Sequence, residues 1–429
     1  MPPVATPNTG CPPHCDVAVV GAGPAGLMAA IAAAEAGARV VVCEQLSRPG
    51  IKLLATGGGR CNLTNTADTD ALMARFGRHG RFMAPALDLH DGPKLRAFFD
   101  TLGVPTDTPD GFHVFPKSNS ARDVLDALLR RARALGVTIA TDAETTGLVI
   151  DDGRLAGVQT SRGAIRCSRV VVATGGKGYP DLGATGTGYR LAEQAGHRIV
   201  PPVPGLVPLV TAERWVTRVA GVTVPKVDVW IDLPKHRRTR HTGPLLFTHK
   251  GLSGPIVLDL SADVATLLAK TPTVPLRIDL TPATSPDAWV ARIGTWQRTH
   301  GRRLLRTLLA QRLPASLAVE LCRVAGAPPD VRAAQVSAEC RRALAGAITA
   351  LPFTIAATQG FGLAIITRGG VALKQVAPHT LASKRLAGLH FAGEVLDLDG
   401  PCGGYNLQWA FASGHLAGRS AAHGCGQGS

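Results

Sequence analysis

The chain has 429 residues, of which 45% are apolar and 18% charged, and its formal net charge is +15. A chain of this length and apolar content predicts two or three packed units and excludes a disordered protein. Only 4% of the residues are aromatic, too few to favour base stacking, so the basic excess indicates solvated arginine faces and no nucleic-acid partner is expected.

The first residues of the sequence do not predict a signal peptide. Residues 1–14 are rich in Pro, Thr and Asn and lack a basic start followed by an apolar run, which predicts a flexible tail rather than a signal peptide. The apolar stretch 17–42 is interrupted by glycines, a proline and charges, so no membrane span is expected. Nine irregularly spaced cysteines favour a reducing compartment, which we take to be the cytoplasm. Because Cys11, His14 and Cys15 lack a further ligand pair, no metal is expected.

The first elements predict a dinucleotide-binding turn. Residues 16–20 (DVAVV) indicate a buried parallel strand, and residues 24–36 indicate an alanine-rich helix. We expect Gly21 to make the tight turn, Gly23 to let the backbone approach a pyrophosphate and Gly26 to allow close helix–strand packing. The residues predicted to surround the pyrophosphate at the helix N-terminus are Gly21, Gly23, Pro24, Ala25 and Gly26.

An acidic residue follows the second strand. The run 39–43 (RVVVC) ends in Glu44, 18 residues after Gly26, where a carboxylate can accept hydrogen bonds from ribose hydroxyls. An acid at this place disfavours a ribose phosphate, so the order of strand, glycine turn, helix, strand and acid predicts FAD or NAD rather than NADP. Gln45, which follows, is also a candidate cofactor contact.

Three successive glycines follow in the segment 51–65 (IKLLATGGGRCNLTN). Such a run provides no side-chain packing, so it indicates close approach of the backbone to a flat or charged ligand, and a mobile surface loop is the alternative. Further along, residues 120–136 predict a structural helix that begins with a capping box, and a hairpin is expected around 151–153. The strand 170–173 runs into Thr174-Gly175-Gly176, small residues that let a cofactor pass the end of the strand.

In the middle of the sequence, short strands separated by prolines are followed by helical segments. This pattern predicts an inserted substrate or cap domain at residues 200–354. Its first part, 200–284, is β-rich and its second part, 285–351, is helical. The expected strands of a small sheet or barrel are 203–210, 223–231, 245–248 and 256–260, and the expected helices are 288–309, 315–324 and 331–351. The basic run 235–241 is expected in an exposed turn.

The last segment returns to the pattern of the first. A strand at 389–392 runs into Gly393-Glu394, and a helix is expected at 409–419 after further glycines. Since one glycine-rich motif lies near residue 20 and the other near residue 400, a single domain must close from both chain ends. We therefore predict a doubly wound, Rossmann-like α/β domain made of residues 15–199 and 355–429.

Several patches together resemble the BaiN/YhiN-like flavoproteins, which include the aminoacetone oxidase family and are distantly related to fumarate reductase flavoproteins. The patches are VVGAGPAGLMAA at 19–30, GGGRCNLTN at 57–65, FPKSNSARDVLDAL at 115–128, VVVATGG at 170–176, LLFTHKGLSGP at 245–255 and FAGEVLDLDGPCGGYNLQWAFASG at 391–414. The chain departs from the family at Gly243-Pro244, where Gly-Glu is usual. The resemblance implies FAD, with contacts from Lys52, Gly58, Gly59, Arg60, Cys61, Asn62, Thr145, Thr174, Gly175, Gly393, Glu394, Gly404, Tyr405, Asn406 and Gln408.

The predicted activity is hydride transfer between flavin N5 and a small organic substrate. The resemblance implies either amine oxidation or reduction of an unsaturated carbonyl, and the sequence does not choose between them. NAD(P)H is a candidate transient reductant, since no second glycine motif follows a strand. Candidate catalytic residues are Tyr405, His249 and Cys61, although Cys61 has no cysteine near it for disulfide chemistry. A flavin-dependent RNA-modifying factor and a non-catalytic flavin sensor stay open as alternatives, and no oligomeric state is predicted.

Overall fold

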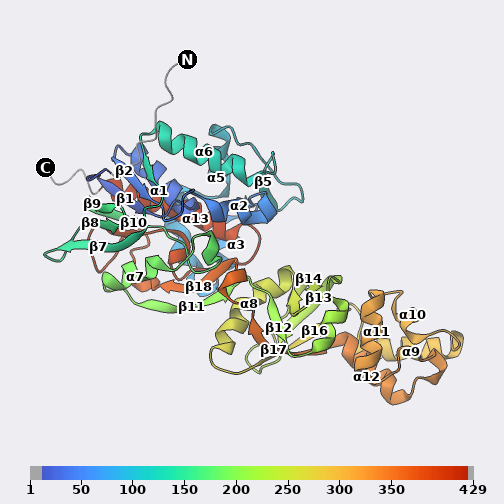
Figure 1. Cartoon of the computed structure of the whole chain (residues 1–429). Coiled ribbons are helices and arrows are strands. Elements are labelled where there is room, and N and C mark those ends of the chain that lie inside the picture. Colours follow the sequence, from blue (N-terminus) through green and yellow to red (C-terminus); the bar gives the residue numbers. More distant parts are fainter. Residues whose placement is uncertain (1–11, 424–429) are drawn as a thin grey trace. The chain divides into compact units, whose positions relative to one another are not determined.

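The computed structural model describes residues 12–423 and divides the chain into two units (Figure 1). Unit 1 contains the chain up to Pro202 and again from Ile366, and unit 2 is Val203–Ile365. In Figure 1 the blue N-terminal and red C-terminal segments lie together in unit 1. The two chain ends therefore share one domain, as the two glycine-rich motifs predicted.

A five-stranded parallel sheet forms the centre of unit 1. Its strands are β1 (Val17–Val20), β2 (Val40–Cys43), β6 (Thr138–Ala140), β10 (Arg169–Val172) and β19 (Leu389–Phe391), in the order β19-β10-β1-β2-β6. β1 and β2 are buried along their whole length, which explains why they read as continuous apolar runs. Because all five strands are parallel, their carboxyl ends meet at one edge, where ligands of open α/β sheets bind.

Helices and two small sheets complete unit 1. The helices are α1 (Pro24–Glu35), α2 (Ile51–Ala55), α3 (Thr69–Ala74), α4 (Ala84–Leu89), α5 (Gly92–Thr101), α6 (Ala121–Ala134), α7 (Thr187–Gln194) and α13 (Tyr405–His423). The sheets are β3-β5-β4, with β3 (Thr64–Asn65), β4 (Thr106–Asp107) and β5 (His113–Pro116), and β7-β8-β9, with β7 (Thr145–Asp151), β8 (Arg154–Thr160) and β9 (Gly163–Arg166). The predicted hairpin and capped helix are the β7-β8 pair and α6, where Ser120 Oγ accepts from Asp123 N.

The first and last long helices are in unusually close contact. A Cβ at Gly414 of α13 would lie 2.3 Å from Ala25 O of α1, and one at Gly418 would lie 2.0 Å from Ala29 O. Only glycine leaves room for the backbones at these two points, because real Cβ contacts stay beyond 3 Å. This packing brings the C-terminal segment against the first glycine turn.

Unit 2 contains a closed barrel and a group of helices. The barrel strands are β12 (Leu209–Thr211), β13 (Thr223–Ile231), β14 (His241–Phe247), β15 (Gly251–Ser253), β16 (Val274–Asp279) and β17 (Leu351–Thr358), in the order β12-β15-β14-β13-β16-β17. The helices are α8 (Pro255–Leu268), α9 (Pro286–Thr299), α10 (Leu305–Leu309), α11 (Ala315–Val324) and α12 (Ala338–Thr349). The predicted barrel with helices is confirmed, and the basic run 235–241 is the exposed connection between β13 and β14.

Three of the predicted elements of the insert are wrong. Residues 256–260, expected as a strand, lie in α8, because a five-residue apolar run does not distinguish strand from helix and Pro255 begins the helix at its first position. Residues 331–351, expected as one helix, contain α12, which begins only after Ser337, whose Oγ accepts from Cys340 N. The expected helix 288–309 is likewise divided into α9 and α10.

Other expected boundaries also shift. The expected strand 203–210 is divided between β11 (Ile199–Gly205) and β12, and the chain passes between the units along β11 and β18 (Ile366–Val371), which pair with each other. The expected end of the insert is residue 354, whereas unit 2 continues to Ile365 because β17 closes the barrel. The expected tail 1–14 lies outside the described residues up to residue 11, while Pro13 O accepts from Arg166 N at 2.9 Å.

Among the residues described, none of the helices has the length and apolar character needed to cross a membrane.

Candidate functional site

The turn after β1 has one open and two crowded glycines. A Cβ at Gly26 would lie 1.8 Å from Gly21 O, and one at Gly21, where φ is +98°, would lie 2.7 Å from Ala173 O. A Cβ at Gly23 would meet nothing within 4 Å. Gly21 and Gly26 are thus required by packing, while Gly23 faces open space at the N-terminus of α1, whose first N–H groups have no side-chain cap.

Glu44 lies at the carboxyl end of β2, next to this turn. Its side chain is buried, and Oε2 accepts from Ala22 N at 2.8 Å while Oε1 accepts from Leu46 N at 2.9 Å. Desolvation by burial raises the pKa of this carboxyl, and the backbone donors oppose that shift. Each oxygen keeps a second lone pair for a further donor. The neighbouring Gln45 side chain donates to Gly183 O at 2.5 Å.

Thr145 supplies an orphaned buried polar atom in unit 1. It is the first residue of β7 and only 3% exposed, and no described group pairs with its Oγ1. The chain immediately before it is tied to β2, since Ala143 N donates to Glu44 O at 2.8 Å. A buried hydroxyl without a partner costs free energy, so this position fits a ligand that passes Glu44.

The triple-glycine segment forms a short 3-10 turn, Thr56–Gly59, in which Gly57, Gly58 and Gly59 all have positive φ. A Cβ at Gly58 would meet nothing within 4 Å, and Gly58 is exposed. Arg60, which follows, places its guanidinium 4.5 Å from the centre of the Phe115 ring. The loop thus presents bare backbone to its surroundings, as expected for contact with a flat ligand.

Cys61 ends this loop and is fully buried with a φ of 62°. Burial raises the pKa of its thiol to about 12, so the sulfur is protonated at neutral pH and is not a thiolate nucleophile.

Asn62 joins the triple-glycine loop to the start of α13. With its amide oriented to satisfy both ends, Nδ2 donates to Val114 O at 3.2 Å and Thr64 O at 2.9 Å, and Oδ1 accepts from Gly404 N at 3.0 Å. Asn65 adds a second link, since its Nδ2 donates to Gly403 O at 2.8 Å. These contacts place residues 57–62 and 403–406 against each other.

The residues that begin α13 have different surroundings. Asn406 shapes the preceding turn, with Oδ1 accepting from Gly400 N at 2.9 Å and Nδ2 donating back to Gly400 O at 2.9 Å. Tyr405 is buried and makes an edge contact with the Phe76 ring. Gln408 is fully buried, and its Nε2 donates to His90 O at 2.7 Å. Its amide therefore serves the packing of α13 on the segment after α4.

A polar network connects Glu394 to three other segments. Lys52 Nζ donates to Glu394 Oε2 at 3.1 Å, and Thr367 N donates to Glu394 Oε1 at 2.8 Å. Thr367 Oγ1 accepts from Lys177 N at 2.7 Å and Gly178 N at 3.1 Å. A Cβ at Gly176 would lie 2.4 Å from Thr367 Oγ1. The backbone N–H of Thr367 therefore holds the Glu394 carboxylate in place, and its hydroxyl holds the loop that follows Thr174 and Gly175.

Gly393, beside Glu394, contacts both α13 and the first helix, α1. Ser413 Oγ accepts from Gly393 N at 2.9 Å, and a Cβ at Gly393 would lie 2.9 Å from the Ala25 Cβ. Sequence reasoning missed Thr367 and Ser413, because a single threonine in a strand and a single serine in a helix carry no local signal. Gly414, which follows Ser413 in the middle of an apolar helix, was the available signal of a close contact there.

All the predicted site residues except His249 belong to unit 1. That histidine is exposed in unit 2, in the turn between β14 and β15. In the described part of the chain, no three His, Cys, Asp or Glu side chains are grouped so as to hold a metal. The unit 1 residues fit an elongated dinucleotide, since Gly23 and the Glu44 carboxylate follow the carboxyl ends of β1 and β2, and an open glycine and an orphaned hydroxyl lie elsewhere in the same unit.

Comparisons with known proteins identify the family of the chain. The family model described as "HI0933-like protein Rossmann domain" matches residues 15–420. The 3-dehydro-bile acid delta(4,6)-reductase of Clostridium scindens is 33% identical over 95% of this chain and 98% of that protein. The ribosomal RNA dihydrouridine synthase of Escherichia coli is 31% identical over 93% of this chain and 96% of that protein.

Among solved structures, the 3-ketosteroid delta1-dehydrogenase of Sterolibacterium denitrificans has a TM-score of 0.52 at 14% identity, covering 96% of this chain and 100% of that chain. This likeness shows the fold. The resemblance drawn from the sequence patches is confirmed, and the chain belongs to the HI0933-like Rossmann family of BaiN/YhiN-like, FAD-dependent oxidoreductases.

Proposed function

We propose that this protein binds FAD along the carboxyl edge of the unit 1 sheet and uses it to reduce a carbon–carbon double bond conjugated to a carbonyl group. The observation that carries the proposal is that Gly23, Glu44 and Glu394 follow the carboxyl ends of β1, β2 and β19, and that Lys52 ties the segment before the triple glycine to Glu394. Bound FAD supplies the hydride at N5 of its flavin ring.

Different residues of this edge contact different parts of FAD. The Gly23 backbone and the N-terminus of α1 receive the pyrophosphate, whose negative charge the helix dipole favours. Glu44 accepts from the adenosine ribose, and the Thr145 hydroxyl offers a partner on the adenosine side. The segment 57–62, the loop at Thr174-Gly175 and Glu394 border the flavin end, where bare glycine backbone allows a flat ring to approach.

Reduction of a conjugated alkene is favoured over amine oxidation by what two relatives are named for. A 3-dehydro steroid with delta(4,6) double bonds is a conjugated enone, and dihydrouridine is uridine whose ring double bond, conjugated to a carbonyl, has been reduced. Conjugate reduction of an enone adds hydride to the carbon remote from the carbonyl and a proton to the nearer one. The two substrates differ greatly in size, and this bond is what they share.

A proton donor and a source of electrons are also needed. Tyr405, Cys61 and His249 are the candidate donors, and the protonated Cys61 thiol can act only as an acid. We propose NAD(P)H as a transient reductant that does not need a nucleotide-binding domain of its own.

The test is anaerobic half-reactions of the purified holoprotein, followed by the flavin absorbance. We expect NADH or NADPH to bleach the flavin, and cyclohex-2-enone or a uridine-containing RNA to restore the colour without oxygen. Cyclohexanone, which lacks the double bond, is the matched control and should leave the flavin reduced. Bleaching by amines, with recovery only in oxygen, would show that the enzyme is an amine oxidase instead.

A further inference from the structure

Two buried cysteines face each other at the amino ends of β1 and β10. Along the pairing of these parallel strands, and at the bridge His14–Arg166 just before it, each residue faces the one 152 positions later. Cys15 and Cys167 have the same separation in the chain, so they are direct neighbours, and Cys15 N donates to Arg166 O at 3.1 Å. Neighbouring strands lie about 4.8 Å apart and carry facing side chains on the same side. This spacing falls within the range of about 4.4–6.8 Å between the Cα atoms of disulfide-bonded cysteines.

The two thiols also interact with each other. A hydrogen bond joins the sulfur atoms, and both side chains are buried. Accepting this bond lowers the pKa of the Cys167 thiol against the effect of burial, whereas donating it, together with burial, raises the pKa of Cys15. Among the described residues, no third His, Cys, Asp or Glu completes a metal site with them. The pair thus combines a nucleophilic sulfur with a neighbouring thiol, which is the arrangement that disulfide formation needs.

The backbone around both cysteines is held in place. Arg166 N donates to Pro13 O at 2.9 Å, and Cys167 N donates to Ala156 O of β8 at 3.1 Å. Because both cysteines precede their strands, they lie at the amino edge of the sheet, whereas the proposed FAD contacts after β1, β2 and β19 lie at the carboxyl edge. A covalent bond here therefore joins two segments that are already neighbours and stays away from the cofactor.

The described cysteines of unit 2 differ from this pair. Cys322 in α11 is buried and Cys340 in α12 is half-buried, and no strand pairing aligns them. Burial raises the pKa of the Cys322 thiol to about 11, so it is protonated at neutral pH and is a poor nucleophile. These two cysteines are therefore a matched control for the pair in unit 1.

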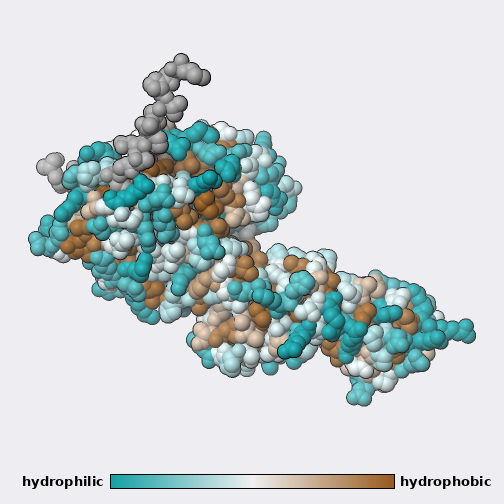
Figure 2. Space-filling view, in the orientation of Figure 1, coloured by the Kyte–Doolittle hydropathy of each residue, from teal (hydrophilic) through white to brown (hydrophobic). Residues whose placement is uncertain are grey.

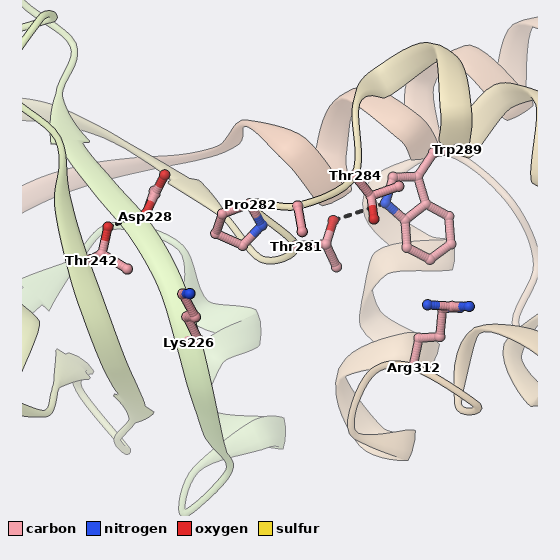
Figure 3. Close-up of a pocket in the computed structure, with 9 residues that line it drawn as sticks. Lys226, Asp228, Thr242, Thr281, Pro282, Thr284, Trp289 and Arg312 are labelled. Carbon is pink, nitrogen blue, oxygen red and sulfur yellow. Dashed lines mark hydrogen bonds between the residues drawn. The ribbon is translucent and has the colours of Figure 1, made fainter.

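The cavity and the charged surface of unit 2 give less indication of a ligand. The cavity has a volume of about 450 Å³, with Lys226 and Arg312 on its two sides (Figure 3). Both cations are exposed, and Thr242 in the lining donates to Asp228 at 2.5 Å. None of the lining residues, all of which are described, has a buried polar atom without a partner. Figure 2 shows hydrophilic residues projecting at the end of unit 2 that carries α9 and α10, as expected for solvated charges.

We propose that Cys15 and Cys167 form a reversible disulfide that ties the beginning of β1 to β10 when the protein meets hydrogen peroxide. The Cys167 thiolate attacks one peroxide oxygen, which breaks the O–O bond, gives a sulfenic acid and releases hydroxide. The Cys15 thiol then attacks that sulfur, so the S–S bond forms and water leaves. The proton lost by Cys167 converts the hydroxide to a second water. The two thiols lose two electrons, the peroxide gains them, and a dithiol such as dithiothreitol reverses the oxidation.

The disulfide should stabilise unit 1. It closes a loop of 152 positions in the unfolded chain, and a crosslink removes more entropy from the unfolded chain as the loop becomes longer. We expect the oxidised protein to unfold at a temperature higher by at least about 5 °C than the reduced protein. The affinity for FAD should differ less than twofold between the two forms, because the crosslink lies at the opposite edge of the sheet.

The first measurement maps the crosslink in the full-length holoprotein after treatment with hydrogen peroxide or with dithiothreitol. Trypsin cuts after Arg39 and on both sides of residues 167–169, so mass spectrometry without reduction should find peptide 1–39 joined to peptide 167–169 in the oxidised sample. Cys11 lies in the same first peptide as Cys15. The mapping is therefore repeated on Cys11→Ala, which should give the same joined peptides.

The second measurement is thermal unfolding of the oxidised and reduced samples, followed by circular dichroism. The difference in the wild type needs no variant that folds. Cys167→Ala should abolish this difference, and the control C322A/C340A should keep all of it.

The proposal is overturned if the Cys11→Ala protein shows no joined peptides, or if sulfinic acid forms in their place. A crosslink that leaves the unfolding temperature unchanged or lowers it would also overturn it, as would loss of the difference in C322A/C340A. Flavin absorbance is recorded on the same samples. Joined peptides in a protein that holds no FAD would refute the proposed function and leave the disulfide standing, whereas FAD-dependent enone turnover without joined peptides would do the reverse.

Discussion

Lys52 Nζ lies 3.1 Å from Glu394 Oε2, although 342 positions separate the two residues in the chain. The pair is half-buried, and the other oxygen of Glu394 is held by Thr367 N. Segments from the beginning, the middle and the end of unit 1 thus meet at one carboxylate. This arrangement explains why neither the glycine-rich segment near residue 20 nor the one near residue 400 could form the proposed site alone.

Thr367→Val should weaken FAD binding. The substitution keeps the shape of the side chain but removes the acceptor for Lys177 N and Gly178 N. A buried N–H left without a partner costs about 1–3 kcal/mol, so we expect a loss of roughly tenfold or more in affinity for FAD. The measurement is the quenching of flavin fluorescence on titrating apoprotein. Thr367→Ser keeps the hydroxyl and should restore binding, and equal weakening by both would show that Thr367 acts only through packing.

Substituting alanine for two glycines of the first turn should have different effects, one on stability and the other on FAD binding. Gly26→Ala places a Cβ 1.8 Å from Gly21 O, so helix and strand must separate and the protein should lose stability. Gly23→Ala meets no protein atom within 4 Å, and its φ of −78° suits alanine. It should fold normally but bind FAD poorly, because the Cβ enters the pyrophosphate space.

Thermal unfolding of the apoproteins, measured by circular dichroism, separates the two effects. A Gly23→Ala protein with normal FAD affinity would mean that the pyrophosphate does not pass this turn.

Glu44→Gln should weaken FAD binding by about 10–100-fold. The carboxylate now accepts from Ala22 N and Leu46 N, and an amide nitrogen in either place would face a donor. Loss of hydrogen bonds to a charged group costs about 1.5–3 kcal/mol. Glu35→Gln is the matched control, since Glu35 is an exposed acid at the end of α1 that pairs with Arg131. If both variants bind FAD equally well, Glu44 is not the ribose ligand.

Much of unit 1 follows from local sequence. The valine runs of β1 and β2 and the glycine spacing from Gly21 to Gly26 predict both the sheet and the turn, because each element is specified within a few residues. Thr367 and Ser413 could not be predicted, since their partners lie far away in the chain. In unit 2 the run 256–260 was misassigned because short apolar runs fit both strands and helices. Asn62 and Gly404 could be assigned to one site only through the family resemblance, because 342 residues separate them in the chain.

Acid should destabilise the protein through three buried histidines. Burial lowers the pKa of His90 to about 3 and those of His197 and His390 to about 4, from an ordinary value of about 6.5. Below pH 6.5 the unfolded chain binds protons that the folded histidines do not, so the free energy of unfolding falls as the pH drops from about 6.5 to about 4. The limiting slope is about 1.4 kcal/mol per pH unit for each histidine.

His90→Phe isolates one of these contributions. His90 stacks on His415 with ring centres 4.9 Å apart, and both His415 and the nearby Lys94 disfavour its charge. Urea unfolding at several pH values should show a smaller loss of stability in the variant than in the wild type between pH 6.5 and 4. An unchanged pH dependence would mean that His90 is protonated equally in the folded and unfolded states.

We expect unit 1 to hold one FAD between the first and last parts of the chain. The most direct measurement is to release the flavin from purified protein by heat, identify it by chromatography, and titrate the apoprotein with FAD. We predict FAD itself, bound at one molecule per chain, with its binding weakened by Gly23→Ala. A colourless protein that takes up no FAD at saturating concentration would contradict it.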